Sequence, residues 1–413
     1  MFCPDELSSA ALSPEELSPE ELSPEELSPE ELSPEELSPE ELSPEELARY
    51  GRHLALADFG PAGQARLKGA RVLLIGAGGL GSPLGLYLAA AGVGVLGIVD
   101  GDRVEDSNLQ RQVLFTTGDI GALKAERAAA RLAALNPHID IRPYPLWLSA
   151  DNALQLIQGY DLVIDGSDNF ATRYLVNDAC VLAGKPLVYG SISGFEGQAS
   201  VFHHRGGPCY RCLFPEPPPP GTVLNCAEGG VLGVLPAIIA SIQATEAIKL
   251  LTGIGESLSG RLLHYDARGM RFREFRAARD EECPVCGERP TIVALEDYRV
   301  VCEAPREGAF AEISPGELKA LLADEDTVLI DVRDPWERDI CHIPGSRAAP
   351  LDILGQVAAQ LDRSRRVICY CKTGSRSASA CRQLAEAGFS NLDNLRGGIL
   401  AWIEEVEPGL PRY

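Results

Sequence analysis

The sequence predicts an α/β protein with two units, a doubly wound sheet followed by a smaller α/β domain. Three observations support this prediction. Short apolar runs at 71–75, 95–99 and 162–164 alternate with helical stretches, which is typical of strands in a buried parallel sheet. A glycine-rich turn directly follows the first run. Two more apolar runs, at 328–330 and 367–370, indicate a second sheet.

Helices are expected between these strands. The patterns predict a helix that follows the glycine-rich turn and runs to about Ala91, helices at 124–135, 231–251 and 377–387, and another that starts after Ser314. Ser314 would be the N-cap of this helix, with Pro315 at its first position.

The N-terminal residues form a low-complexity tail. Leu-Ser-Pro-Glu-Glu occurs seven times between Leu12 and Glu46 and supplies 14 glutamates. Each copy offers a helix start, with Ser as N-cap and Pro at the first position, but the recurring proline would break any longer helix. We therefore expect residues 1–47 to be disordered or transiently helical, with no effect on the catalytic groups.

Composition argues against several classes of protein. The chain has 413 residues, 45% of them hydrophobic, so it can bury more than one core. A formal net charge of −23 argues against nucleic acid as the main partner. No apolar run is long enough to span a bilayer and no secretory signal is evident, so we expect a cytoplasmic protein without a membrane partner. Its twelve cysteines should then serve metal binding, catalysis or packing rather than disulfides.

The glycine-rich turn predicts a nucleotide site. Gly76, Gly78 and Gly81 fit the pattern G-x-G-x-x-G between a strand and a helix, and Asp100 ends the next strand. The glycines let backbone amides approach a phosphate at the helix N-terminus, and the acid can accept hydrogen bonds from a ribose. A tight turn without a ligand is the structural alternative, and the pattern alone would also fit NAD or FAD.

Charged residues after the strands favour ATP over a dinucleotide. The segment 106–112 is unusually polar, Lys124 opens the next helix, and Asp165 and Asp168 follow a later strand. Adenylating a carboxylate requires cations at the phosphates and a carboxylate that holds Mg²⁺, whereas hydride transfer requires neither. The sequence therefore predicts an ATP-dependent reaction at the carboxyl edge of the sheet.

Residues 48–286 resemble the molybdopterin-synthase and thiamine-biosynthesis adenylyltransferases, which are relatives of the ubiquitin-activating enzymes. The resemblance rests on residues 49–53, 76–81, 107–111, Asp100, Lys124, Asp168, Asn169 and Arg173. It implies a Rossmann-like fold and a nucleotide site made of Gly76, Gly78, Gly79, Gly81, Asp100, Ser107, Asn108, Leu109, Gln110, Arg111, Lys124, Asp168 and Asn169.

The resemblance also implies a role for several of these residues. Asp100 would bind the ribose, and Asp168 would hold Mg²⁺ and act in catalysis. The phosphates would be held by Asn108, Arg111 and Lys124. The family works as a homodimer in which an N-terminal arginine reaches the phosphates in the partner subunit, and Arg52 fits that position. A solvated surface charge is the alternative for Arg52.

Two C-x-x-C pairs predict a metal centre. Cys209 with Cys212 and Cys283 with Cys286 would supply four thiolates to a tetrahedral, structural Zn²⁺. The resemblance implies this closed site, which leaves no open position for catalysis at the metal. A redox-active C-x-x-C is the alternative.

Cys226 lies on a loop after a proline-rich segment. Family members with a rhodanese extension place a cysteine here that can bond covalently to the activated carrier, and the resemblance implies that role for Cys226. A plain loop cysteine is the alternative.

The second unit carries a cysteine loop. Cys371 follows a strand, and a C-x4-R spacing leads to Arg376 and a helix. Backbone amides of the loop, the helix N-terminus, Lys372 and Arg376 would all favour a thiolate or persulfide anion at Cys371. A cysteine-dependent phosphatase has a loop one residue longer and usually a histidine before the cysteine, where Tyr370 stands here.

This second unit, expected at 312–413 after a linker at 287–311, resembles a single rhodanese domain. The resemblance rests on the cysteine loop and on motifs at 331–333, 342–346 and 395–399. It implies that Cys371 carries a persulfide. A degenerate rhodanese that only binds is the alternative.

Together these features predict a function with two chemical steps. The chain would use ATP to adenylate the C-terminal glycine of a ubiquitin-like sulfur carrier that ends in Gly-Gly. It would then pass sulfur from Cys371 to that glycine to give a thiocarboxylate, in a molybdopterin, thiamine or tRNA-thiolation type of pathway. A cysteine desulfurase or thiosulfate would load Cys371. The expected catalytic residues are Arg52, Arg111, Lys124, Asp168, Cys226 and Cys371.

Two alternatives remain open at this point. An NAD-dependent oxidoreductase would share the glycine-rich turn but would leave the cysteine pairs and the second unit unexplained. A non-catalytic scaffold that binds such carriers would not need the charged residues of the cleft or Cys371.

Overall fold

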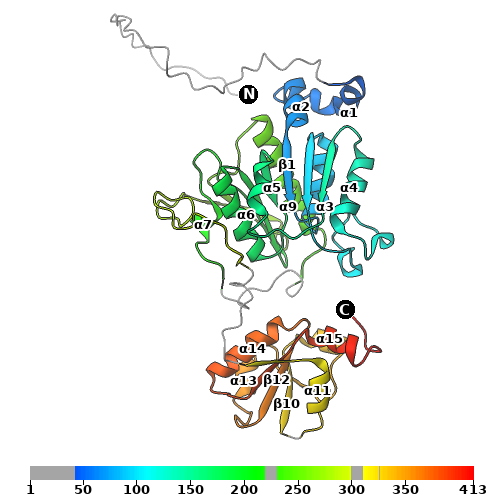
Figure 1. Cartoon of the computed structure of the whole chain (residues 1–413), viewed down its shortest axis with the longest axis vertical. Coiled ribbons are helices and arrows are strands. Elements are labelled where there is room, and N and C mark those ends of the chain that lie inside the picture. The colour runs from blue at the N-terminus through cyan, green and yellow to red at the C-terminus, as the bar shows by residue number, and fades with distance from the viewer. Residues whose placement is uncertain (1–41, 219–229, 299–309, 325) are drawn as a thin grey trace, which may run out of the picture.

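The protein forms two α/β units, which confirms the predicted fold class (Figure 1). This computed structural model describes residues 42–218, 230–298, 310–324 and 326–413. The first unit is built on an eight-stranded sheet and the second on a five-stranded sheet. Figure 1 shows them as separate bodies, the second below the first.

The first sheet has the strand order β3-β2-β1-β4-β5-β6-β7-β8. Its strands are β1 Arg71–Ile75, β2 Val95–Val99, β3 Asp140–Tyr144, β4 Leu162–Asp165, β5 Leu187–Ser193, β6 Glu196–Phe202, β7 Arg261–Asp266 and β8 Arg271–Arg276. The pairs from β3 to β5 are parallel, and β6 to β8 continue the sheet in antiparallel fashion. The strand order reverses between β1 and β4, which is where ligands bind in such sheets.

Helices cover both faces of this sheet (Figure 1). They are α3 Gly81–Ala91, α4 Lys124–Leu135 and α9 Leu235–Thr252 on one face, and α5 Ala153–Gln158 and α6 Phe170–Ala183 on the other. Alternate residues of β1 point to opposite faces, so that Val72 and Leu74 join the first core and Leu73 and Ile75 the second. This is why the strand is apolar throughout.

The helix α9 begins four residues later than predicted. The sequence suggested a helix from residue 231, but Val231 instead forms a β-bridge with Gly194, and the helix starts at Leu235 with Pro236 in its first turn. Among the described residues, α9 is also the one helix whose length and composition would allow it to cross a membrane. It packs against the sheet, with Ile239 and Ala240 fully in the core.

The last copy of the N-terminal repeat is helical, although the sequence predicted a disordered tail as far as residue 47. The helix α1 Pro44–Leu54 starts inside that copy, with Ser43 as its N-cap. Glu46 is buried, accepts a hydrogen bond from the Ser43 amide and forms an ion pair with Lys68 at 2.8 Å. Lys68 is the partner that the sequence pattern did not reveal. The other copies lie outside the described residues.

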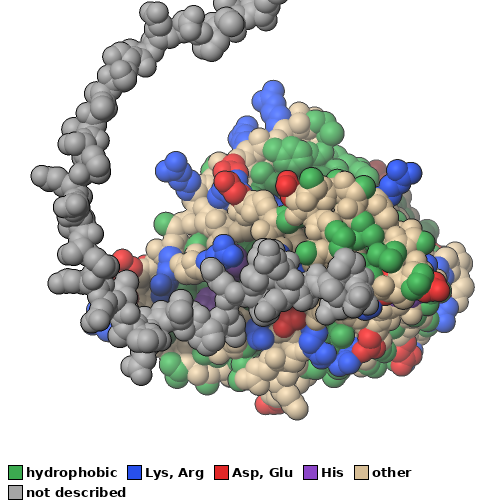
Figure 2. Space-filling model, turned by 90° about the horizontal axis from the view of Figure 1, so that it is seen from above, with side chains coloured by type: hydrophobic (Ala, Val, Ile, Leu, Met, Phe, Trp, Pro, Cys, Tyr) green, Lys and Arg blue, Asp and Glu red, His purple; other side chains and the backbone are tan. Residues whose placement is uncertain are grey.

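The helix α1 packs on α2 Gly60–Gly69 at the amino edge of the sheet. The Tyr50 hydroxyl accepts a hydrogen bond from Asn136, which precedes β3. Figure 2 views this end of the molecule, and Lys and Arg side chains stand out from it at several places.

The predicted linker at 287–311 is partly folded onto the first unit. Tyr298 is buried, and its hydroxyl donates a hydrogen bond to Asp178 at 2.6 Å. Leu295 packs against the same core. At the other end, the first strand of the second unit already begins at Ala311. Both ends of the predicted linker thus belong to folded units.

The second sheet is entirely parallel, in the order β11-β10-β12-β13-β9. Its strands are β9 Ala311–Ile313, β10 Thr327–Asp331, β11 Arg347–Ala348, β12 Arg366–Tyr370 and β13 Leu392–Leu395. The helices are α11 Pro315–Leu321, α12 Pro335–Ile340, α13 Leu354–Ala358, α14 Ser375–Glu386 and α15 Gly398–Glu405. As the sequence predicts, Ser314 caps α11 by accepting a hydrogen bond from the Glu317 amide.

Candidate active sites and metal centre

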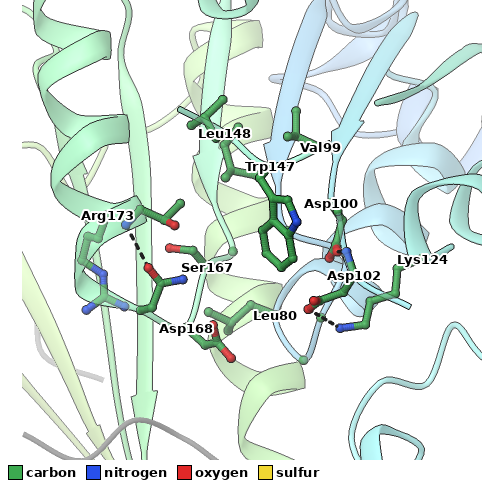
Figure 3. A pocket seen from close by; sticks show the side chains of 18 of the residues that line it. Leu80, Val99, Asp100, Asp102, Lys124, Trp147, Leu148, Ser167, Asp168 and Arg173 are labelled. Atoms are coloured by element: carbon green, nitrogen blue, oxygen red, sulfur yellow. Dashed lines mark hydrogen bonds and ion pairs between the residues drawn. The ribbon is translucent and has the colours of Figure 1, made fainter. Parts of the chain in front are cut away.

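A cleft opens at the carboxyl ends of β1, β2 and β4, where the strand order reverses (Figure 3). With its open mouth it holds about 850 Å³ of space, within the range of roughly 300–1,000 Å³ that is usual for ligand pockets. Of the residues predicted to bind nucleotide, it is lined by Gly76, Gly78, Gly79, Asp100, Arg111, Lys124, Asp168 and Asn169. The predicted residues Gly81 and 107–110 are not part of this lining.

The glycine-rich turn can form only with glycine at two positions. Gly76 has φ +90°, and its carbonyl oxygen would lie 1.9 Å from a Cβ placed on Gly81. Gly81 therefore lets the first turn of α3 pass directly over the end of β1. The turn brings backbone amides to the mouth of the cleft, as the sequence suggested.

Asp100 and Lys124 lie on the same side of the cleft (Figure 3). Asp100 accepts a hydrogen bond from the Ala77 amide at 2.8 Å and thereby holds the glycine turn in place. Burial raises the pKa of Asp100, and the charge of Lys124 partly opposes this rise. The side chain of Lys124 is only 7% exposed, and its amine forms an ion pair with Asp102 at 2.9 Å. Asp102, which the sequence analysis missed, thus fixes the position of the lysine amine (Figure 3).

The polar segment 106–112 is folded by its own side chains. Asp106–Asn108 is a short 3-10 helix in which Asn108 accepts a hydrogen bond from the Glu105 amide. Arg111 donates to the carbonyl of Ser107 at 3.0 Å. Asn108 is buried here and stabilises the turn, whereas Arg111 lines the cleft.

Gln112 is a further residue of the cleft that the sequence analysis did not single out. It is buried, and its Oε1 atom has no hydrogen-bond partner among the described residues. Its Nε2 atom lies beside Gly78. The Oε1 atom is thus a buried acceptor without a partner at the wall of the cleft, and Gln112 follows directly after the predicted Arg111 in the sequence.

Two aspartates at the end of β4 have opposite environments. Asp165 is fully buried, accepts two hydrogen bonds from Ser167 and lies 3.6 Å from the Arg173 guanidinium. Burial raises the pKa of Asp165, while Arg173 opposes the rise. Asp168 is exposed in the cleft and has no hydrogen-bond or ion-pair partner in the part of the chain that the structure describes.

Arg52 lies far from this cleft within one chain. It is an exposed residue of α1, at the amino edge of the sheet, while the cleft is at the carboxyl edge (Figure 1). The structure therefore does not bring Arg52 together with Arg111, Lys124 and Asp168 inside a single subunit.

Four cysteines converge although 70 residues separate the two pairs in sequence. The Sγ atoms of Cys209, Cys212, Cys283 and Cys286 all lie within 4.8 Å of one another. Three of the separations are 3.4, 3.5 and 3.9 Å. A tetrahedral zinc with Zn–S bonds of about 2.3 Å requires sulfurs about 3.8 Å apart. The four residues thus fit a closed zinc site. Cys226 lies outside the described residues.

The second candidate site surrounds Cys371, which follows β12. Its side chain is fully buried, and its Sγ accepts hydrogen bonds from the Gly374 amide at 3.1 Å and the Ser377 hydroxyl at 3.4 Å. Gly374 has φ +107°, a conformation that favours glycine and turns its amide toward the sulfur. One backbone amide of the loop and one hydroxyl thus point at the sulfur, where the sequence predicts several loop amides.

The two cations of the loop are held by residues distant in sequence. Arg376 forms a bidentate pair with buried Glu337, with N–O distances of 2.6 and 2.7 Å. Lys372 lies 4.7 Å from the ring of Tyr413. The Tyr413 hydroxyl donates to Glu337 and accepts a hydrogen bond from Arg333. Neither Glu337 nor Tyr413 was predicted from sequence, because no local pattern links them to the loop.

A nucleotide-type cleft on a doubly wound sheet, joined to a domain with a buried cysteine loop, defines a two-domain transferase of α/β class. The family model described as the ThiF family matches residues 50–285, and the model of the rhodanese-like domain matches residues 314–405. The chain belongs to the ThiF family and carries a rhodanese-like domain after it. It is an enzyme of the adenylyltransferase and sulfurtransferase class.

Two relatives match most of this chain, and a third matches about three fifths of it. The probable adenylyltransferase/sulfurtransferase MoeZ of Mycobacterium tuberculosis is 51% identical over 378 residues, which cover 89% of this chain and 95% of the relative. The adenylyltransferase and sulfurtransferase MOCS3 of Mus musculus is 44% identical, over 88% of this chain and 87% of the relative. The sulfur carrier protein adenylyltransferase of Thermus thermophilus is 57% identical, over 62% of this chain and 96% of the relative.

A solved structure shares the fold of the first unit. The crystal structure of Escherichia coli MccB aligns with a TM-score of 0.53 and 23% sequence identity, and covers 59% of this chain and 73% of that one. At this level of identity the likeness concerns the fold alone.

Proposed function

We propose that the chain adenylates the C-terminal glycine of a ubiquitin-like sulfur carrier and then transfers sulfur to it from a persulfide on Cys371. The observation that carries the proposal is the presence of two chemically complementary sites in one chain. One cleft offers cations and an unpaired carboxylate for nucleotide chemistry, and one loop cradles a sulfur atom. The name of the Thermus thermophilus relative, 57% identical, supports a sulfur carrier as the substrate.

In the first step a carboxylate oxygen of the carrier attacks the α-phosphorus of ATP and pyrophosphate leaves. Arg111 and Lys124 would neutralise charge on the phosphates, and amides of the glycine turn would bind there as well. Asp100 would accept hydrogen bonds from the ribose. Asp168 would hold Mg²⁺, which supplies positive charge at the phosphates when it is bound.

In the second step the terminal sulfur of the Cys371 persulfide attacks the acyl carbon and AMP leaves. The product is an acyl disulfide between carrier and enzyme, and a thiol must then reduce its S–S bond to release the thiocarboxylate. The Gly374 amide and the Ser377 hydroxyl would stabilise the anionic sulfur. Before this attack the activated carrier would be able to bond covalently to Cys226, and a cysteine desulfurase or thiosulfate would load Cys371.

Several accompanying features belong to the same proposal. The four-cysteine cluster would bind one structural Zn²⁺ and no substrate, because all four positions are protein ligands. The active form would be a homodimer in which Arg52 reaches the cleft of the partner subunit, and the enzyme would act in the cytoplasm. The carrier would belong to a molybdopterin, thiamine or tRNA-thiolation type of pathway.

Two competing functions remain testable. An NAD-dependent oxidoreductase would bind NAD in preference to ATP and release no pyrophosphate. A non-catalytic scaffold would bind a carrier without changing its mass. The unpaired Asp168 in the cleft and the hydrogen-bonded Cys371 sulfur favour catalysis over both.

The test measures the intact mass of Gly-Gly-ended carriers after incubation with the protein, ATP and Mg²⁺, with and without thiosulfate. A carrier that exchanges one oxygen for sulfur supports both steps. With Cys371→Ser this exchange should stop, while pyrophosphate and the adenylated carrier still form. With Cys381→Ala, a buried cysteine of α14 outside the loop, the exchange should continue. If no carrier changes mass and no pyrophosphate is released from ATP with any carrier, the proposal fails. The non-catalytic scaffold then becomes the preferred function.

A further inference from the structure

Trp147 is a large aromatic side chain exposed inside the nucleotide cleft. It lies between β3 and α5, and 55% of its surface is exposed. Figure 3 shows that its indole projects into the cleft, between Asp100 on one side and Ser167 on the other. Among the described residues that line this cleft, it is the one aromatic side chain. The sequence analysis did not single it out.

The indole is placed by its surroundings. A Cβ on Gly101 would lie 2.8 Å from two ring carbons of Trp147, so the absence of a side chain at 101 lets the ring rest against the backbone there. Asn152 donates a hydrogen bond to the Trp147 carbonyl at 2.9 Å and accepts one from the Ser149 amide. The following residue, Leu148, is buried in the core. The backbone at Trp147 is therefore held in place, and the ring rests against Gly101.

The position of the indole relates it to a particular part of a nucleotide. Gly101 directly follows Asp100, the acid that would hold the ribose under the proposed function. The base is bonded to the ribose, so it must lie within a few ångströms of this acid. Apolar side chains of Leu80, Val99 and Leu148 line the cleft around the indole (Figure 3). A flat, apolar and aromatic wall suits a nucleobase better than it suits a phosphate.

We propose that Trp147 stacks on the base of the bound nucleotide and so contributes to the selection of ATP. This inference rests on the proposed function for the identity of the nucleotide. Stacking depends on the overlap of two ring systems, so a purine base gains more binding free energy from it than a smaller pyrimidine base. The alignment of Trp147 against Gly101 means that little side-chain freedom has to be lost when the base binds.

The test is a comparison of dissociation constants, measured by calorimetry on the full chain. Trp147→Ala should weaken binding of ATP by about tenfold or more, which is the usual effect of removing a stacking side chain. Ribose 5-triphosphate, which lacks a base, should bind wild type and Trp147→Ala equally. The preference for ATP over CTP should shrink in the variant. In wild type, ATP should also quench indole fluorescence, and Trp147→Phe should lose that quenching while losing less affinity than Trp147→Ala.

The matched control is Trp336→Phe, because Trp336 has a similar exposed fraction of 59% but lies in the second unit. Gly101→Ala serves as a second variant if Trp147→Ala folds poorly, since it displaces the indole without removing it. Unchanged ATP affinity in Trp147→Ala overturns the inference, and so does equal weakening of ATP and ribose 5-triphosphate. Either result leaves carrier adenylation by wild type intact. Failure of wild type to bind ATP at all would instead overturn the proposed function.

Discussion

At the scale of single residues, environment separates two aspartates that are only three positions apart. Asp165 is fully buried beside Arg173, and its Oδ1 atom accepts two hydrogen bonds from Ser167. Asp168 lies in the cleft without a partner among the described residues. Unpaired carboxylates that face a cleft are the ones available to a metal ion, whereas Asp165 organises the loop that presents Asp168.

Asp168→Asn should therefore impair chemistry without impairing folding. Loss of a carboxylate that holds Mg²⁺ should lower the rate of pyrophosphate release by about 100-fold or more. The melting temperature should change by no more than about 2 °C, because an exposed side chain without partners contributes little stability. Pyrophosphate release and thermal unfolding are measured side by side. Asp151→Asn, an exposed aspartate outside the cleft lining, is the control, and equal activity of the two variants would contradict the assignment.

At the scale of elements, the glycine turn illustrates a geometric requirement. A Cβ on Gly81 would collide with the Gly76 carbonyl oxygen, so α3 could not begin where it does. Gly81→Ala should lower the free energy of unfolding by about 1–3 kcal/mol and abolish measurable ATP binding, because the backbone must shift. Denaturant unfolding and calorimetry check both effects. Gly69→Ala, at the end of α2, meets nothing within 4 Å and should leave both quantities nearly unchanged; a comparable loss there would argue against the steric explanation.

The pair formed by Glu337 in α12 and Arg376 in α14 makes the second unit sensitive to acid. Burial alone would raise the pKa of Glu337, but the hydrogen bonds and charge of Arg376 outweigh burial, and the pKa lies below its ordinary value. A lowered carboxyl pKa contributes stability that is complete above the unfolded pKa, about 4.3. That stability is lost as the pH falls through the folded pKa.

Glu337→Gln should therefore be most damaging at neutral pH. It leaves Arg376 buried without a counter-charge, and we expect a loss of about 3–5 kcal/mol at pH 7. The difference in free energy of unfolding between wild type and variant should narrow as the pH falls below about 4. Urea unfolding at several pH values measures this difference. The control is Glu386→Gln on the exposed side of α14. If this difference in free energy stays constant with pH, the loss of the ion pair is not its cause.

The cysteine cluster joins elements that are distant in sequence. Cys209 is the N-cap of the short helix α7 Tyr210–Leu213 and Cys212 lies within it, while Cys283 and Cys286 precede the segment that carries Tyr298. The purified protein should contain one zinc per chain, and Cys283→Ala should lose it and destabilise the first unit by more than about 4 kcal/mol. Elemental analysis and thermal unfolding test this. Cys180→Ala should keep its zinc, and a zinc-free wild type with unchanged stability would refute the metal centre.

At the scale of the whole molecule, the distance between Arg52 and the cleft predicts cooperation between subunits. Arg52 is exposed at the amino edge of the sheet, so it can reach a nucleotide only in another subunit. Arg52→Ala alone should be as inactive in adenylation as Asp168→Asn. When the two variants are mixed and allowed to exchange subunits, mixed dimers regain one complete cleft, and about a quarter of wild-type activity should return. No recovery after proven subunit exchange would place Arg52 outside the reaction.

Sequence alone determined the succession of strands and helices, because apolar periodicity, glycine turns and helix caps act over a few residues. The strands β1 and β2 and the helix α4 have the predicted bounds, and Cys371 stands at the predicted junction of strand and loop. These features depend on local spacing, which the chain shows directly.

Tertiary structure decided which distant side chains meet. Periodicity could not indicate that Lys68 would fold the last repeat copy into α1, that Tyr413 and Glu337 would hold the cations of the Cys371 loop, or that Trp147 would enter the cleft. Each of these depends on a contact between segments that approach only when a complete sheet has formed. The physical reason is that burial and ion pairing are set by three-dimensional packing, whereas propensity and spacing are set by neighbours along the chain.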